Sequence, residues 1–358
     1  MKILHINAGL EEGGAKTHIL SLLSQFPSGM AELLLLEEGS ISQEARLLGI
    51  KVHVIKQRSR YDLTILKRLI DFIKVNHYDV VHTHGARSNL LLALIRKRLN
   101  LTWVATVHSD PVLDFMGNGL KGKIFSYLNL KSLKKVDKLI AVTERLKSDL
   151  IKKDVSKEKI FVVYNGIIFG ENPVVKKTHT IFTLTCVARL HPVKAHDFLF
   201  EVLKSSGLTN FHLNVVGDGE LRHKLELKVS ELKLEKQIQF HGSLDKLEIE
   251  KILQQTDVTV LTSLSEGFPL VLLESAEQKI PFISTNVGDI AKLVPDSSYG
   301  WLIPSLNPNA LSAALKEAYV FWQTGTLSAK GEKLFELASK KFSLKSAYLE
   351  TIRVYEAR

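Results

Sequence analysis

The dominant feature of this chain is the regular alternation of short strand-like segments with longer helix-like segments along almost its whole length. Several of the short segments, such as 33–36 and 139–142, are continuously apolar. Strands that are buried on both faces of a parallel sheet have this character. Repeated strand–helix units of this kind predict a doubly wound α/β fold. The predicted strands span residues 2–7, 31–37, 51–55, 80–84, 103–108, 138–142, 160–164, 181–188, 212–217, 238–241, 258–261 and 281–285.

The series is interrupted once. Residues 169–180 contain glycine, proline and polar residues without any period, which is typical of a linker. A chain of 358 residues is long enough for two domains. We therefore expect a Rossmann-like domain over 1–168 and a second one over 181–341. Such sheets bind ligands at the carboxyl ends of their strands, so two facing sheets predict a ligand cleft.

Composition and the N-terminal segment restrict the cellular context. The single cysteine, Cys186, lies in an apolar strand-like run, so it is expected to be a buried small hydrophobe and not a nucleophile. A lone cysteine is compatible with a reducing cytoplasm. The first residues resemble a strand and not a signal peptide, and no apolar run is long enough to cross a bilayer. We expect a cytoplasmic protein.

The segment from Ser265 to Glu274 contains the most informative candidate site. Glu266 lies on a Gly/Pro-containing loop, and Glu274 follows eight positions later on an apolar helix-like segment. Pro269 suits the first turn of that helix. A helix N-terminus attracts phosphate, and carboxylates accept hydrogen bonds from sugar hydroxyls. The arrangement predicts a sugar–phosphate ligand.

Two cations follow the strand 181–188. Arg189 and Lys194 are five positions apart on the same loop and can together hold a diphosphate. The alternative is ordinary surface charge. No Asp-x-Asp pair occurs in the sequence, so no carboxylate-held metal is expected and the negative charge would be neutralised by these cations and helix N-termini.

Glycines and histidines at other strand ends are weaker candidates. Gly13 and Gly14 follow the first strand, where they allow close backbone approach to a ligand or merely form a tight turn. Neither this segment nor Gly217–Arg222 matches G-x-G-x-x-G, which argues against a dinucleotide dehydrogenase. His108 ends a strand and is a candidate for hydrogen bonding or acid–base chemistry. His82 and His84 are more simply read as polar lining than as a metal pair.

Taken together, these motifs resemble the retaining glycosyltransferases of family 4, which have the two-domain GT-B fold. The resemblance covers nearly the whole chain and depends on the ordered set more than on any single motif. The set comprises Gly13-Gly14, His108, Asn165-Gly166, Arg189 with Lys194, Val216–Gly219, Glu266 with Glu274, and Asn286–Gly288.

The resemblance implies donor-binding roles in the C-terminal half. Arg189 and Lys194 would hold the donor diphosphate, and Glu274 would hold the ribose hydroxyls. The donor sugar and its neighbouring phosphate would be held by Glu266 and by the backbone of Gly267, Phe268, Pro269 and Leu270. Gly217, from the Val216–Gly219 motif, is also counted as donor-binding.

The resemblance also implies roles in the N-terminal half. Gly13 and Gly14 would approach the diphosphate or the acceptor, Asn165 is counted as donor-binding, and His108 would contact the transferred sugar. With Arg189, Lys194 and Glu266, His108 completes the expected catalytic set. Such enzymes are thought to retain the anomeric configuration by same-face substitution without an enzyme nucleophile. Residues 342–358 would form a helix that returns to the N-terminal domain.

Three positions depart from the family pattern. Ala195 and Asp289 stand where the family commonly has glycine, and Ile168 stands where an aspartate is frequent. None of these changes removes a charged contact to the donor.

Net positive charge is confined to the first half of the chain. Residues 1–170 contain 26 Lys and Arg against 16 Asp and Glu, whereas residues 171–358 contain 22 of each. The segment between Asp114 and Asp137 has no acidic residue and combines lysines with apolar side chains at helical spacing, which is typical of a membrane-surface helix. The alternative is a helix that packs its apolar stripe inward. The residues of this candidate surface are Lys121, Lys123, Ile124, Phe125, Leu128, Lys131, Lys134 and Lys135.

The sequence therefore predicts a metal-independent retaining glycosyltransferase, peripheral at the inner face of the membrane and without a cofactor. It would transfer a hexose or N-acetylhexosamine from a nucleotide-diphosphate sugar, most simply UDP, to a lipid-linked or other membrane-bound cell-envelope glycan. Nucleic acid is not an expected partner, because the basic run lacks a recognition motif. The alternatives are a soluble transferase for a protein or small-molecule acceptor, and a catalytically silent partner subunit.

Overall fold

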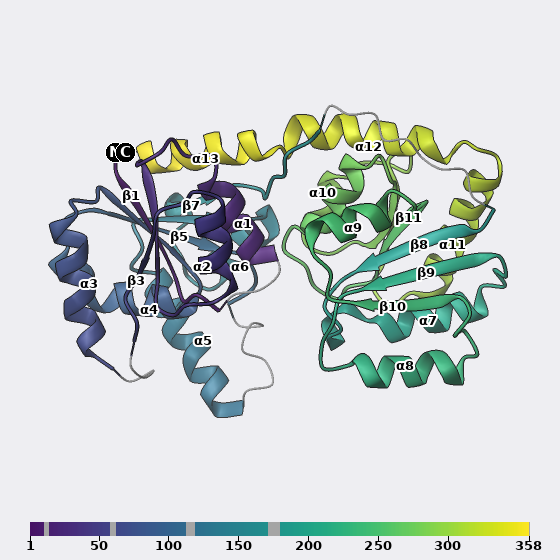
Figure 1. The fold of residues 1–358 in the computed structure, drawn as a ribbon, viewed down its shortest axis with the longest axis horizontal. Helices are drawn as coiled ribbons and strands as arrows, with labels where there is room; N and C mark the ends of the chain where they lie inside the picture. Colours follow the sequence, from purple (N-terminus) through teal and green to yellow (C-terminus); the bar gives the residue numbers. More distant parts are fainter. Residues whose placement is uncertain (11–13, 58–61, 112–118, 171–179, 358) are drawn as a thin grey trace. The chain divides into compact units, whose positions relative to one another are not determined.

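The chain forms two compact units. The computed structural model describes residues 1–10, 14–57, 62–111, 119–170 and 180–357 (Figure 1). The N-terminal unit consists of Met1–Gly166 together with Leu344–Arg358, and the C-terminal unit consists of Ile167–Ser343.

The N-terminal unit is built on a parallel sheet. Its described strands are ordered β3-β2-β1-β4-β5-β6-β7, and every neighbouring pair is parallel. The strands are β1 (Ile3–Asn7), β2 (Ala31–Leu35), β3 (Val52–Val54), β4 (Val80–His84), β5 (Thr102–Val107), β6 (Lys138–Ala141) and β7 (Ile160–Val162). The helices are α1 (Gly14–Leu23), α2 (Ser40–Leu47), α3 (Thr64–Val75), α4 (Ala86–Ile95), α5 (Gly119–Leu133), α6 (Glu144–Lys152) and α13 (Leu344–Glu356).

Helices cover both faces of this sheet. On one face, α3, α4, α5 and α6 pack on side chains such as Leu4, Val81 and Trp103. On the other face, α1 and α2 pack on β2, and α13 packs on Ile3 and Val80. The strands are thus buried on both sides, which explains why their sequences are so apolar.

The C-terminal unit repeats this plan with the strand order β10-β9-β8-β11-β12-β13, again with parallel neighbours. Its strands are β8 (Phe182–Val187), β9 (Phe211–Val216), β10 (Ile238–Gly242), β11 (Val258–Leu261), β12 (Phe282–Thr285) and β13 (Trp301–Ile303). Its helices are α7 (His196–Ser205), α8 (Arg222–Glu231), α9 (Lys246–Leu253), α10 (Leu270–Glu277), α11 (Pro308–Gln323) and α12 (Leu327–Lys341). The predicted doubly wound α/β architecture is confirmed.

One strand was missed by the sequence analysis. β13 has three residues, and it pairs in parallel with β12. Gly300 precedes it, and a Cβ there would lie 2.8 Å from the carbonyl oxygen of Phe282. The strand is too short for its pattern to be distinguished from a loop.

Several helix ends follow local signals in the sequence. The side chain of Thr143 accepts a hydrogen bond from the backbone N–H of Leu146 at the start of α6. Asp245 and Glu248 form a reciprocal capping box on α9. Among the described residues, no helix combines the length and apolar character that crossing a bilayer requires.

Gly331 lets α12 pack against the end of α10. A Cβ at this buried position would lie 1.8 Å from the carbonyl oxygen of Lys279, a contact that requires the backbone to move. We expect Gly331→Ala to lower the free energy of unfolding by about 2–4 kcal/mol, because helix propensity gains only ~1 kcal/mol against this clash. Chemical denaturation measures the change.

Gly14→Ala is the matched control. Gly14 is also helical, but no heavy atom lies within 4 Å of the position that a Cβ would occupy there. This variant should be neutral or stabilising by up to ~1 kcal/mol. Equal effects of the two substitutions would contradict the packing explanation.

Candidate active site

Four charged residues singled out from the sequence lie at or near the carboxyl ends of strands in the C-terminal unit. Arg189 follows β8, and Lys194 ends the short 3-10 helix Pro192–Lys194. Glu266 lies on the loop between β11 and α10, and Glu274 lies within α10. Pro269 is the N-cap of α10, so the helix begins at Leu270, one residue later than expected.

The structure joins two of these residues directly. The Lys194 Nζ lies 2.5 Å from the Glu266 Oε1, and their side chains are only 20% and 10% exposed. A charged pair at this depth is largely desolvated, so each partner holds the other in place and limits its hydration. Arg189 is exposed, and among the described residues its side chain has no hydrogen bond or ion pair. It is therefore available to an anion.

Hydrogen bonds to main-chain carbonyl oxygens join the loops that carry Lys194 and Glu266. The Thr262 hydroxyl donates to the carbonyl oxygens of Lys194 and Ala195, each at 3.1 Å. The backbone N–H of Leu264 donates to the carbonyl oxygen of Val193 at 2.7 Å. The positions of the charged side chains are thus set by rigid main chain.

Gly217 and Gly219 have a packing role. Gly217 has a φ of +128°, and a Cβ there would lie 2.2 Å from the carbonyl oxygen of Ala188. A Cβ on Gly219 would lie 2.5 Å from the carbonyl oxygen of Leu190. These glycines let the loop after β9 lie against the loop that carries Arg189, so the sequence motif Val216–Gly219 is explained without any ligand.

Gly288 has a similar packing role at the loop that carries Glu266. Its φ is +59°, and a Cβ there would lie 2.3 Å from the carbonyl oxygen of Gly267 and 2.7 Å from that of Glu266. Phe268 is buried and its ring contacts Phe342 with centroids 4.8 Å apart. The segment Glu266–Phe268 is therefore packed against both Gly288 and Phe342.

Glu274 lies in an environment that favours its neutral form. Burial raises the pKa of this carboxyl, Lys246 opposes the shift, and Glu277 adds to it. Among the described residues, no hydrogen bond or ion pair of its side chain is present. A desolvated carboxyl group without a partner is ready to accept hydrogen bonds from hydroxyl groups.

One departure from the family pattern has a structural consequence. Ala195 adopts left-handed backbone angles, with a φ of +50° and a ψ of +47°, and caps both the 3-10 helix and α7. This conformation favours glycine, so alanine here costs about 1 kcal/mol.

In the N-terminal unit, two of the predicted residues are brought together by a histidine that the sequence analysis missed. The His18 ring, on α1, contacts the His108 ring with centroids 4.9 Å apart. Asn165 lies beside His18 and opposes the lowering of its pKa. Gly14 begins α1, whereas Gly13 lies outside the described residues. His18 lies one helical turn after Gly14, which is the signal that could have identified it.

His18 and His108 are the end of a buried histidine layer on the α13 side of the sheet. The ring of His84 stacks on those of His5 and His82, with centroids 5.2 and 4.3 Å away, and lies 5.9 Å from that of His108. Burial lowers the pKa of His5 to about 3 and that of His18 to about 4, and it places the pKa values of the other three well below 6.5. All five imidazoles are therefore neutral at pH 7.

Three of these histidines could in principle hold a metal ion. Ligand atoms of His5, His82 and His84 all lie within 4.8 Å of one another. Hydrogen bonds already occupy most of these nitrogens: the His5 Nδ1 pairs with the His84 Nε2 at 2.9 Å, and the His82 Nδ1 pairs with the Tyr355 hydroxyl at 2.7 Å. A metal would have to replace these bonds. As observed, the cluster anchors α13, which carries Tyr355.

Cys186 is buried, and burial raises the pKa of its thiol to about 12. A thiol with this pKa is not a nucleophile at neutral pH. The prediction that it is a buried small hydrophobe is confirmed.

Comparison with known proteins identifies the family. The profile described as Glycosyltransferase Family 4 matches residues 12–169, and the one described as Glycosyl transferases group 1 matches residues 169–320. The chain is a family-4 glycosyltransferase with the GT-B fold.

Individual relatives are distant. The chain is 28% identical to the uncharacterized glycosyltransferase MJ1178 of Methanocaldococcus jannaschii, over 80% of this chain and 77% of the relative. It is also 28% identical to the UDP-Gal:alpha-D-GlcNAc-diphosphoundecaprenol alpha-1,3-galactosyltransferase of Escherichia coli, over 68% of this chain and 66% of the relative. The solved structure of Anabaena HepE with UDP-glucose superposes with a TM-score of 0.87 at 17% identity, with both chains covered completely.

The histidine layer predicts a steep loss of stability in acid. In the unfolded chain histidines titrate near pH 6.5, whereas the folded pKa values lie well below that. Between these values the unfolded state binds more protons, so the free energy of unfolding falls as the pH drops below 6.5 and is unaffected by these groups above it. Each buried histidine contributes up to about 1.4 kcal/mol per pH unit.

Chemical denaturation at several pH values between about 7.5 and 5.5 measures this slope. His18→Gln should make it shallower by about one proton, whereas the exposed His223→Gln should leave it unchanged. A free energy of unfolding that does not change over this range would contradict the burial of neutral histidines.

Proposed function

We propose that the C-terminal unit binds a nucleotide-diphosphate sugar, with UDP as the nucleotide, and that the protein transfers a hexose or N-acetylhexosamine from it. The observation that carries this proposal is the set of charged groups near the strand ends. Lys194 is paired with Glu266, and among the described residues neither Arg189 nor the desolvated Glu274 has a side-chain hydrogen bond or ion pair. Cations suit a diphosphate, and carboxyl groups suit sugar and ribose hydroxyls. UDP is favoured because the galactosyltransferase relative is named for UDP-Gal and HepE was solved with UDP-glucose.

In the proposed reaction, Arg189 and Lys194 stabilise the negative charge that develops on the departing diphosphate. The bond between the anomeric carbon and the phosphate oxygen breaks, and the acceptor hydroxyl oxygen bonds to the anomeric carbon on the same face. The proton of the acceptor hydroxyl passes to the departing phosphate oxygen, so the anomeric configuration is retained. Neither a metal ion nor an enzyme nucleophile takes part, and Glu266 positions the sugar.

We infer that His108 acts as a hydrogen-bonding group and not as an acid. Burial and the neighbouring His18 hold its pKa well below 6.5, so its imidazole is neutral at pH 7. Its ring makes a T-shaped contact with that of His18, which holds its orientation. A neutral imidazole in a fixed orientation can donate to a sugar hydroxyl.

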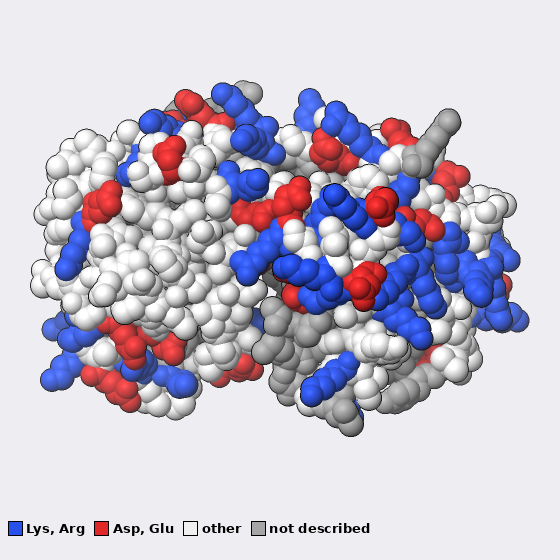
Figure 2. Space-filling model, turned by 180° about the vertical axis from the view of Figure 1, so that it is seen from behind, with Lys and Arg blue, Asp and Glu red and all other residues white. Residues whose placement is uncertain are grey.

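The acceptor is proposed to be a lipid-linked or membrane-bound cell-envelope glycan, reached from the cytoplasmic face. The galactosyltransferase relative is named for a diphosphoundecaprenol-linked acceptor, and other similar proteins are named for a cps region and for the lipopolysaccharide outer core. Lysine and arginine side chains gather on the surface of the N-terminal unit, seen on the right in Figure 2. An anionic membrane surface matches this charge.

The orientation of α5 supports the membrane proposal. Ile124, Phe125 and Tyr127 are 51%, 46% and 63% exposed, so much of their apolar surface is open to solvent. The buried side of the helix includes polar residues such as Ser126 and Asn129. Exposed apolar side chains flanked by lysines are typical of a helix that lies in a membrane interface.

A polar contact explains how α5 can be oriented this way. The Asn89 Nδ2 on α4 donates to the Asn129 Oδ1 at 3.2 Å, and the Ser132 hydroxyl donates to the Leu128 carbonyl. These bonds satisfy the hydrogen-bonding groups of Asn129 and Ser132 on the buried side of α5. The outward lysines are Lys121, Lys123, Lys131, Lys134 and Lys135, all exposed, while Leu128 is half-buried.

A soluble transferase is the alternative on the acceptor side, and it requires no role for the exposed face of α5. A catalytically silent subunit is disfavoured because the charged set around Lys194 and Glu266 is complete and held in place.

Substitutions in the donor set test the proposal. Arg189→Ala should weaken UDP binding by about tenfold or more, because a hydrogen bond to a charged group is worth ~1.5–3 kcal/mol. Glu274→Ala should weaken binding of the nucleoside part to a similar extent. Isothermal titration with UDP measures both, and Lys204→Ala, an exposed lysine on α7, is the control. Unchanged affinity in both site variants would place the donor elsewhere.

Substitutions on α5 test the membrane proposal separately. Phe125→Ser with Lys121→Glu should reduce binding to vesicles that contain anionic lipid by about tenfold or more, because a lysine near such a surface contributes ~1 kcal/mol and a buried phenylalanine more. Vesicle co-sedimentation measures the binding, and UDP affinity should not change. Lys97→Glu, at an exposed position outside α5, changes the net charge by the same amount and is the control. Equal losses in the two variants would contradict a specific role for α5.

A further inference from the structure

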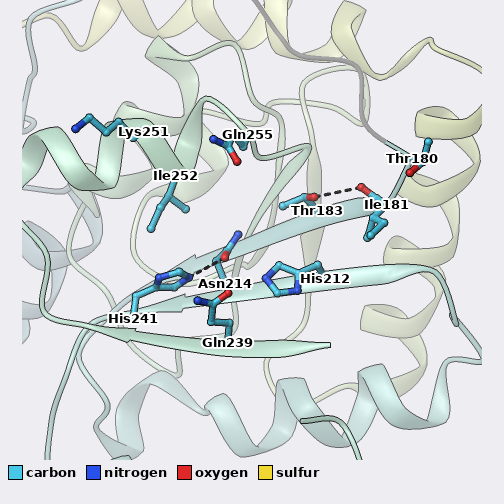
Figure 3. Close-up of a pocket in the computed structure, with 10 residues that line it drawn as sticks. All are labelled: Thr180, Ile181, Thr183, His212, Asn214, Gln239, His241, Lys251, Ile252 and Gln255. Atoms are coloured by element: carbon cyan, nitrogen blue, oxygen red, sulfur yellow. Dashed lines mark hydrogen bonds between the residues drawn. The ribbon is translucent and has the colours of Figure 1, made fainter. Parts of the chain in front are cut away.

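The C-terminal unit contains a second, polar groove that the donor site does not use. It has a volume of about 610 Å³ and lies between the end of α9 and the strands β8, β9 and β10 (Figure 3). The residues that line it are Thr180, Ile181, Thr183, His212, Asn214, Gln239, His241, Lys251, Ile252 and Gln255. Its volume falls within the range of small-molecule sites.

The groove exists because three strands alternate in character. Along β8, β9 and β10, apolar residues such as Leu184, Leu213 and Phe240 face the helices α7, α8 and α11. Most of the intervening residues are polar and face α9. In a parallel sheet covered on both sides such positions are normally apolar. The polar positions are Thr183, Thr185, His212, Asn214, Gln239 and His241.

The groove is separate from the donor set. Thr183 and His212 are the second residues of β8 and β9, at the amino ends of the strands. Arg189 and Gly217 follow the carboxyl ends of the same two strands. The groove runs from these amino ends to His241, the fourth residue of β10, and none of the donor residues lines it.

The hydrogen bonds on the floor of the groove determine what it can recognise. The His241 Nε2 lies 2.8 Å from the Asn214 Oδ1, and the Asn214 Nδ2 donates to the Thr185 hydroxyl at 3.5 Å. An amide oxygen only accepts, so the His241 Nε2 must donate, and the neutral ring then carries its lone pair on Nδ1. Burial and the neighbouring His212 lower the pKa of His241, which keeps the ring neutral.

Apart from Lys251, the remaining lining consists of uncharged polar and apolar side chains. Gln239 and Gln255 are exposed and offer both donors and acceptors, and Lys251 is the one charged side chain among the lining residues. Its ammonium points away from Asn214 and His241 in Figure 3. Ile181 and Ile252 supply apolar surface on opposite sides. An accepting imidazole nitrogen repels an anion and suits a hydroxyl group.

From these observations we propose that the groove is a binding subsite for a neutral sugar, about one or two residues long. Hydroxyl groups of the sugar pair with His241, Asn214 and the glutamine amides, and its C–H faces contact the two isoleucines. The subsite goes beyond the proposed donor chemistry, since it predicts glycan binding without any nucleotide. Binding of a glycan in the groove would keep the enzyme close to the polysaccharide that it extends.

The test uses the full chain without nucleotide. The probes are lactose, cellobiose and N,N′-diacetylchitobiose at millimolar concentration, followed by saturation-transfer NMR and by the imidazole signals of His212 and His241. At least one disaccharide should bind saturably and shift both imidazoles. Gln255→Leu, at an exposed position, and His241→Leu should each weaken binding by about fivefold, the effect of one lost hydrogen bond. The exposed His223→Leu, on α8, is the control.

UDP affinity should be unchanged in both groove variants, which separates this proposal from the donor proposal. The proposal is overturned if no neutral disaccharide shifts the two imidazoles, or if binding survives in both variants. It is equally overturned if only glucuronate or inorganic phosphate shifts them, because the groove would then be an anion site.

Discussion

The candidate site depends on direct contact between backbones at the carboxyl ends of the C-terminal sheet. Gly217 and Gly219 lie against the loop that carries Arg189, and Gly288 lies against the loop that carries Glu266. Any side chain at these three positions would overlap a carbonyl oxygen. Hydrogen bonds from Thr262 and Leu264 join the loop that carries Glu266 to the loop that carries Lys194. The Lys194 ammonium lies 2.5 Å from the Glu266 carboxylate, largely out of water. Such preorganised charge is what stabilisation of a departing diphosphate requires.

Much of this could be predicted from the sequence, for identifiable reasons. Buried parallel strands are nearly continuous apolar runs, so the strand series and the doubly wound class were readable, apart from the three residues of β13. The charged residues at strand ends were recognisable because parallel sheets place all carboxyl ends at one edge. The glycine motifs were found, but Gly217 packs against Ala188, which only the folded backbone can reveal.

Other features depend on tertiary contacts and had a weaker signal. His18 and His5 join the histidine layer through packing between α1, β1 and β4, and nothing near them in the sequence marks a cluster. The sequence correctly indicated a basic helix with apolar side chains near residue 124. Which side of this helix is buried depends on the contact between Asn129 and Asn89 on α4. The polar groove could have been predicted from the alternation of apolar and polar residues along β8, β9 and β10. This pattern is less conspicuous than the continuous apolar runs of other strands.

Nucleotide release from a panel of UDP-, GDP- and ADP-sugars, in EDTA, with and without a membrane extract, tests the proposed transferase activity. A UDP-sugar should turn over in EDTA, release should increase with the extract, and the product should retain the anomeric configuration of the donor. No nucleotide release from any donor with the extract present, or activity that returns only when a divalent metal is added, would contradict a metal-independent glycosyltransferase.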